Sequence, residues 1–135
     1  MPPTGEPVRQ EKSLDEVVES VGLYPADAYH FVEQGLGYTV LKIHGEKKNP
    51  KVNRHVSGPQ LCEGLREFAL KRWGLMARAV LARWNVTSTL DFGRIVFAMI
   101  DGGRMSKTDE DDIDDFKDVF DFRTAFEAGY RIECK

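Results

Sequence analysis

The stretch that decides the fold is SGPQLCEGLREFALKRWGLMARAVLARWNVTSTLDFGRIVFAMID, which runs from Ser57 to Asp101. It holds most of the aliphatic and aromatic bulk of the chain, and Gly74 and residues 85–88 divide it into three segments. Leu61, Leu65 and the apolar residues after them recur at three- and four-residue steps, which is the spacing of one helix face. We therefore predict three consecutive helices, over about 59–73, 75–84 and 89–101, as the centre of the fold.

The ends of these helices carry local signals. Ser57 and Gln60 form a predicted capping box with Pro59 in the first turn, and Gly74 suits the end of that helix. Residues 75–84 contain few polar side chains, so we expect the second helix to be buried on most sides. Ser88 and Asp91 resemble a second capping box, with Asp in place of Glu or Gln.

The flanking segments are predicted to pack onto this centre. Residues 1–12 are rich in proline and charge, so we expect a disordered arm before a single helical domain over 13–135. A capping box at Ser13 opens a short helix, and a longer one runs from about Pro25 to His44. Residues 38–43 also suit a strand. We favour the helix, in which Gly35 and Gly37 would permit close contact with a neighbouring helix.

The C-terminal part is less regular. Thr108 is a predicted cap for a helix whose apolar face holds Ile113, Phe116, Val119 and Phe120, and a last helical turn follows Asp121. Residues 130–134 alternate in polarity, and pairing with 104–107 would make a small two-stranded ribbon. The predicted fold class is mainly α, with about six helices around the central three-helix array.

Composition bounds the class of protein. The 135 residues are 41% hydrophobic and 30% charged, which fits one globular domain. No apolar run approaches the roughly 20 residues that a bilayer requires, and the N-terminus lacks the order of a signal peptide. Cys62 and Cys134 make no disulfide framework, and we expect Cys62 to be a reduced, buried side chain. These features predict a cytoplasmic protein that does not bind membranes.

The net charge of −3 conceals a segregation along the chain. Residues 1–43 carry a net charge of −4, residues 44–100 carry +6, and residues 101–135 carry −5. One interpretation is internal, with acidic flanks lying against the basic centre, and we favour it. The other is an exposed basic face that meets an anionic partner.

The densest cationic cluster lies in the polar loop before Ser57. Its candidate contacts for an anion or a nucleic acid are Lys47, Lys48, Lys51, Arg54 and His55. The free amides at the start of the following helix also favour anions. A solvated loop without function explains the same composition.

The helices over 75–84 and 89–101 have the outline of a DNA-binding helix-turn-helix, but the second has a single basic residue, Arg94, balanced by Asp91. An antiparallel hairpin of helices is the interpretation we favour. The acidic run from Asp109 fails the EF-hand pattern, and the three histidines show no zinc-ligand spacing. The sequence thus predicts no cofactor, metal or catalytic residue, and it leans away from an enzyme.

Several phrases of the chain resemble a known family. They are Tyr24-Pro25-Ala26, Tyr38-Thr39-Val40, Ile43-His44-Gly45, His55 to Leu61, Arg72 to Leu75, Asp91 to Phe97 and Lys107 to Asp111. Together they resemble a family of uncharacterised bacterial proteins of about this length, of planctomycete and verrucomicrobial type. The resemblance covers about residues 13–126 and implies a small bacterial protein, without an activity or a functional residue.

The leading hypothesis is a non-enzymatic module that binds a protein partner or itself. The first alternative is a nucleic-acid-binding protein that uses the helix-turn-helix-like hairpin and the basic 47–55 loop, with contacts also from Arg66, Lys71, Arg72, Arg78 or Arg83. The second alternative is a small enzyme or metal protein with a site that the sequence does not reveal.

Overall fold

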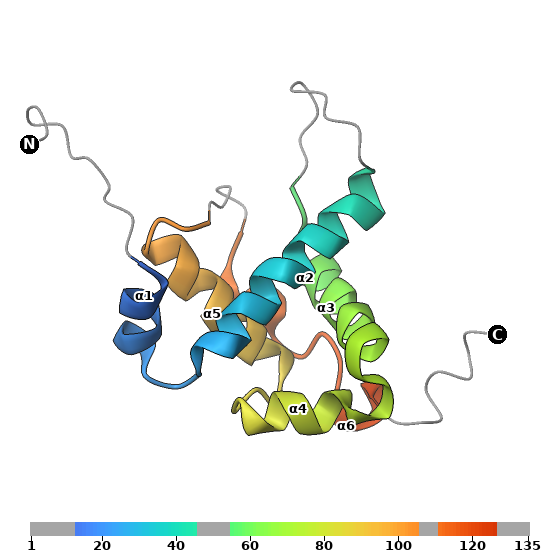
Figure 1. Cartoon of the computed structure of the whole chain (residues 1–135). Coiled ribbons are helices and arrows are strands. Elements are labelled where there is room, and N and C mark those ends of the chain that lie inside the picture. The colour runs from blue at the N-terminus through green and yellow to red at the C-terminus, as the bar shows by residue number, and fades with distance from the viewer. Residues whose placement is uncertain (1–12, 46–54, 106–110, 127–135) are drawn as a thin grey trace, which may run out of the picture.

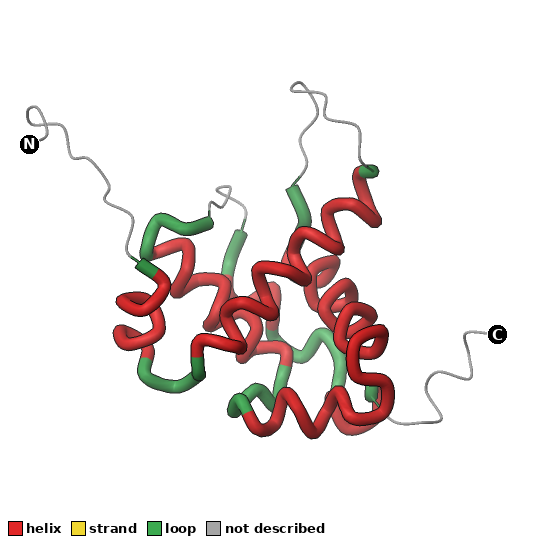
Figure 2. Tube along the Cα trace, in the orientation of Figure 1, coloured by secondary structure: helices red, strands yellow, loops and turns green. Residues whose placement is uncertain are grey.

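The computed structural model of the chain describes residues 13–45, 55–105 and 111–126. These residues form helices joined by turns, and no strand occurs among them (Figure 1, Figure 2). The mainly α fold class is therefore confirmed. The predicted arm over 1–12 and most of the predicted ribbon lie outside the described residues.

The first two helices begin and end close to where the sequence places them. Helix α1 (Leu14–Val21) starts at the Ser13–Glu16 capping box and ends at Gly22, whose φ is +72°. Helix α2 (Ala26–His44) follows Pro25, which is its N-cap residue. Residues 38–43 lie within α2, so the helical prediction for them is confirmed. Figure 1 shows α2 crossing the molecule diagonally, in front of α3 and α5.

Helices α2 and α3 (Gly58–Trp73) approach closely because each contributes a glycine to their contact. A Cβ atom on Gly64 would lie 1.8 Å from the Thr39 Oγ1 atom, and one on Gly35 would lie 2.2 Å from a methyl carbon of Leu65. The predicted role of Gly35 is therefore confirmed. The same prediction is wrong for Gly37, which has no atom within 4 Å of its Cβ position. The predicted capping box at Ser57 is present at the start of α3.

Helix α5 (Thr89–Asp101) lies at the centre of the molecule and packs against α1, α2 and α3. Phe92, Ile95 and Met99 are fully buried in it. Its first turn contains Asp91, which is only 5% exposed. The Asp91 carboxylate accepts hydrogen bonds from the Tyr24 hydroxyl at 2.5 Å and from the backbone N–H groups of Thr87 at 2.9 Å and Ser88 at 3.2 Å. This network fixes the α1–α2 connection to the start of α5.

Asp91 carries a charge that its surroundings stabilise. Burial alone would raise its pKa, but hydrogen bonds from Tyr24, Thr87 and Ser88 and the nearby charge of Arg94 lower the pKa below its usual value. The Arg94 Nη1 atom lies 3.0 Å from the carboxylate. For Tyr24, burial and then the hydrogen bond to Asp91 raise the pKa to about 12.

The prediction that residues 75–84 form a helix buried on most sides is wrong. Gly74 has a φ of +56°, and the chain continues as a short 3-10 turn, η2 (Gly74–Met76), before helix α4 (Ala77–Arg83). Leu75 and Met76 are 56% and 62% exposed. Because α4 is short and lies at the lower edge of the molecule in Figure 1, only its Ala77 and Leu81 reach the core. Helix α2, and not the segment 75–84, packs against α3 and α5 in the centre of the fold.

The predicted helix over 108–120 is also wrong for the residues that the structure describes. Only a 3-10 turn, η3 (Ile113–Phe116), forms there, and the short helix α6 (Phe122–Ala125) follows. The buried Thr89 hydroxyl donates to the Phe116 carbonyl at 2.6 Å and accepts the Val119 N–H at 3.1 Å. Those two backbone groups are therefore bonded to α5 instead of to a helix of their own. Thr108 lies outside the described residues.

A pair of glycine substitutions tests the contact between α2 and α3. Gly64→Ala should lower the free energy of unfolding by about 1–3 kcal/mol, because its methyl group would overlap the buried Thr39 side chain. Gly37→Ala, in open space on α2, should raise the free energy of unfolding by about 0.5–1 kcal/mol. Urea unfolding measures both, and equal effects of the two changes would contradict the packing.

Asp91→Asn tests the buried network at the start of α5. We expect it to lower the free energy of unfolding by about 2–3 kcal/mol at neutral pH, since the substitution removes a hydrogen-bonded buried charge. The folded-state pKa is lowered, so the stabilisation is complete above the ordinary value of 3.8 and disappears as the pH falls through the folded-state pKa. The difference from wild type should therefore shrink in acid.

The exposed Asp101 at the other end of α5 provides the control. Asp101→Asn should change the free energy of unfolding by less than about 0.5 kcal/mol. Denaturant titrations across a series of pH values compare the three proteins. A constant difference between wild type and Asp91→Asn down to acid pH would contradict a charged role for Asp91.

Candidate functional site

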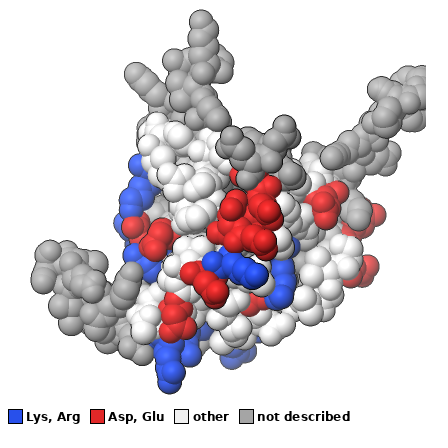
Figure 3. Space-filling view, turned by 180° about the vertical axis from the view of Figure 1, so that it is seen from behind, with Lys and Arg blue, Asp and Glu red and all other residues white. Residues whose placement is uncertain are grey.

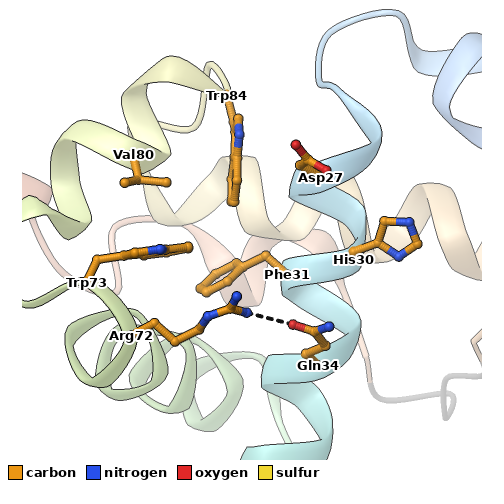
Figure 4. A pocket seen from close by; sticks show the side chains of 8 residues that line it. All are labelled: Asp27, His30, Phe31, Gln34, Arg72, Trp73, Val80 and Trp84. Carbon is orange, nitrogen blue, oxygen red and sulfur yellow. Dashed lines mark hydrogen bonds between the residues drawn. The ribbon is translucent and has the colours of Figure 1, made fainter.

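A groove of about 370 Å³ opens between α2, the end of α3 and α4 (Figure 4). We call it the aromatic groove, and it is lined by Asp27, His30, Phe31, Gln34, Arg72, Trp73, Val80 and Trp84. It exists because the chain turns at Gly74, so that α4 leaves the end of α3 and passes beside the N-terminal half of α2. Its size is at the small end of the range for ligand sites, about 300–1,000 Å³.

Three aromatic rings from three different helices or their ends meet in the aromatic groove. The ring centroid of Phe31 lies 5.2 Å from that of Trp73 and 6.0 Å from that of Trp84, and the two indoles lie 5.5 Å apart with planes inclined at 78°. Phe31 is 2% exposed and also contacts Phe92 of α5, at 6.4 Å between centroids. The rings are thus anchored in the core, and the two indoles remain partly open to solvent.

Polar side chains form the rim of the aromatic groove. The Arg72 Nη1 atom donates to the Gln34 Oε1 atom at 2.8 Å, a bond drawn in Figure 4. The Arg72 guanidinium also lies 5.3 Å from the Trp73 ring centroid and 5.6 Å from that of Phe68. These contacts hold the guanidinium in place while it stays exposed. Asp27 contributes the one carboxylate of the lining.

The helices that form one wall of the groove are basic. Residues 68–90 contain no Asp or Glu, but they contain four cations, which we call the elbow cations: Lys71, Arg72, Arg78 and Arg83. All four are exposed, and none pairs with a carboxylate in the part of the chain that the structure describes. Among the described residues, no carboxylate of the acidic flanks pairs with these four cations, and the internal interpretation of the charge segregation stays a prediction.

On the face shown in Figure 3, acidic side chains gather near the centre, and basic ones lie beside them and along the left and lower edges. The described ion pairs that span distant parts of the chain join Lys42 to Glu67, His55 to Asp111 and Arg104 to Glu33. Among the described residues, the acidic C-terminal flank thus forms an ion pair at His55, and none of its described carboxylates pairs with an elbow cation.

Of the predicted anion-contacting residues, the structure describes only His55. Lys47, Lys48, Lys51 and Arg54 lie outside the described residues. His55 is described: its Nε2 atom lies 2.9 Å from the Asp111 Oδ1 atom, and its carbonyl oxygen lies 2.8 Å from the His44 Nε2 atom. His44 is at the C-terminal end of α2, roughly 20 Å along the helix from His30. The structure therefore places His55 and the aromatic groove near opposite ends of α2.

The hairpin of α4 and α5 does not have the exposure of a helix-turn-helix. A recognition helix must present one face to a DNA groove. Helix α5 instead buries seven of its residues against the surrounding elements, and its Arg94 pairs with Asp91. The part of the nucleic-acid hypothesis that depends on α5 as a recognition helix is thus not supported.

Chemistry based on metals or thiols has little to build on in the described residues. They contain no group of three or more His, Cys, Asp or Glu side chains that could hold a metal ion. Cys62 is fully buried, as predicted, and burial followed by the charge of Glu63 raises the pKa of its thiol well above the usual range. The reactive thiolate is therefore disfavoured at this position.

A second, more apolar hollow of about 350 Å³ lies between the end of α2 and the start of α3. Ile43 and Pro59 line it, together with the aliphatic stems of charged residues. Lys42 and Glu67 pair across it, and Tyr38 donates to Glu67 at 3.1 Å. Burial would raise the Glu67 pKa, but these two partners lower it. Leu41 and Ile43 are 50% and 40% exposed beside this hollow.

Sequence reasoning missed the aromatic groove. It gave Phe31, Trp73 and Trp84 no role beyond the helical segments in which they lie. The absence of acidic residues from 68–90 was visible in the sequence, and it is the one signal that could have marked this surface.

Comparisons of the chain with protein-family models, with curated proteins and with solved structures found no match. Among the described helices, none combines the length and the apolar character needed to cross a bilayer.

Proposed function

We propose that this chain is a non-enzymatic protein-interaction module and that the aromatic groove, with Arg72 at its rim, is its contact surface. The observation that carries the proposal is the meeting of Trp73, Trp84 and Arg72 on one concave surface. Trp and Arg are the residue types most enriched among side chains that dominate binding energy at protein interfaces.

The neighbouring residues support the same function. Leu75 and Met76 are more than half exposed at the turn next to the groove, where a monomer gains nothing from exposing them. Helices α2 and α3 are rigidly packed, so a partner side chain would enter a preformed hollow at low ordering cost. A location in the cytoplasm of a bacterium belongs to the proposal, and the free, buried Cys62 is consistent with it.

Nucleic-acid binding is the second candidate, because exposed cations beside aromatic rings are also found where proteins stack the bases of single strands. Two observations weigh against it. Phe31 is buried, which leaves only the partly open indoles for stacking, and the Asp27 carboxylate in the groove would repel a phosphate.

Affinity purification of the full chain from its own cells tests the proposal. Wild type should retain a defined set of proteins after nuclease treatment, and Trp84→Ala should lose that set because it removes one wall of the groove. Leu41→Ala, which shortens an exposed apolar side chain at the far end of α2, is the matched control and should retain it. Mass spectrometry identifies the retained proteins, and light scattering detects self-association.

Circular dichroism must first show that each variant is folded. Truncation of the partly buried Trp84 costs up to about 3–5 kcal/mol, and Val80→Gln provides a milder change in the same wall. Failure of wild type to retain any protein or to self-associate would contradict the proposal. Loss of the retained proteins upon nuclease treatment would favour the second candidate.

A further inference from the structure

The charge of the surface around the aromatic groove indicates what kind of partner it accepts. Resting on the proposed function, we infer that the groove takes an apolar side chain from an acidic segment of the partner, and that Arg72 and Arg83 bind the carboxylates on either side of that side chain. The partner chemistry is therefore an acidic peptide with an apolar anchor.

The first argument is charge complementarity. The wall formed by the end of α3, η2 and α4 carries the four elbow cations without a single carboxylate between Glu67 and Asp91. None of these cations has a described acidic partner within the molecule. Three of the four are arginines, whose planar guanidinium groups match the geometry of a carboxylate. A basic partner would be repelled by the same surface.

The second argument is the preorganisation of Arg72. Its guanidinium is held by Gln34 and by the faces of the Trp73 and Phe68 rings, and it remains exposed at the edge of the groove. The side chain entropy that an arginine normally loses on binding is therefore already partly lost. A carboxylate next to the anchoring side chain would meet a guanidinium already in position.

The third argument comes from the geometry of α4. Successive residues of a helix are rotated by about 100°. Arg83 therefore lies roughly 60° from the groove-lining Val80, on the side away from the buried Ala77 and Leu81. Arg78 lies roughly 160° from Val80, on the far side of the helix. Arg72 lines the groove, and Arg83, which is not part of the lining, lies closer in angle to Val80 than Arg78 does.

The lone carboxylate of the lining favours a peptide over a nucleic acid. Asp27 lies on α2, on the side of the groove opposite the end of α3 (Figure 4). Its oxygens can accept a backbone N–H from a bound peptide, whereas an ionised phosphate group carries no donor for them. The groove volume of about 370 Å³ suits one large apolar side chain with its adjoining backbone.

Selection of displayed random peptides against the full chain tests the inference, followed by calorimetric titration of the selected peptides. The peptides should contain several Asp or Glu residues around one large apolar residue. Arg72→Glu and Arg83→Glu should each weaken their binding by at least about tenfold. Arg78→Glu makes the same charge change on the same helix, outside the groove, and should weaken it by less than about threefold.

A charge exchange sharpens the test. Peptides in which the acidic residues are replaced by Lys should not bind wild type, and they should gain affinity for the Arg83→Glu variant. Equal losses for Arg78→Glu and Arg83→Glu, enrichment of basic or neutral peptides, or no enrichment at all would overturn the inference. Tighter binding of a single-stranded oligonucleotide than of the selected peptides would also overturn it, in favour of nucleic acid.

The two proposals fail in different ways. If the proteins retained from cells depend on Trp84 but are unaffected by Arg72→Glu and Arg83→Glu, the protein-interaction function stands and the acidic partner is wrong. If no retained protein depends on Trp84, the proposed function itself fails.

Discussion

The close packing of α2 on α3 is the contact on which the rest of this structure depends. Gly64 lets the Thr39 side chain lie directly on the α3 backbone, and Gly35 gives Leu65 the same access to α2. No larger residue fits at either position unless the Thr39 or Leu65 side chain, or the helix that carries it, shifts. Because the two helices are held this near, α5 can pack on both of them, and the Phe31 ring of α2 comes within contact distance of Trp73 at the end of α3.

Local signals in the sequence were read correctly because they act over one helical turn. Ser13, Ser57 and Ser88 precede helices as predicted, and the long helix through residues 38–43 forms despite its β-favouring composition. Helix caps and helix periodicity involve residues only a few positions apart, so they can be predicted without knowledge of the fold.

The errors arose where distant contacts decide the outcome. The Thr89 hydroxyl bonds to backbone groups of Phe116 and Val119, and it thereby prevents the helix that the apolar spacing of 113–120 predicts. Residues 75–84 are apolar enough for a buried helix, but Gly74 directs them to the edge of the molecule. The aromatic groove depends on the same turn. The groove joins residues that are far apart in the chain, so its lining could not be predicted from the sequence. The absence of acidic residues from 68–90, beside the groove, is visible in the sequence.

The positions of Trp73 and Trp84 have a further consequence. They are the two tryptophans of the chain, and both border the same hollow, partly exposed to solvent. Nearly all of the intrinsic ultraviolet emission of the protein therefore originates within a few ångströms of the candidate site. Their spectra sense whatever enters or leaves that hollow without a label, and the molecule supplies its own optical probe.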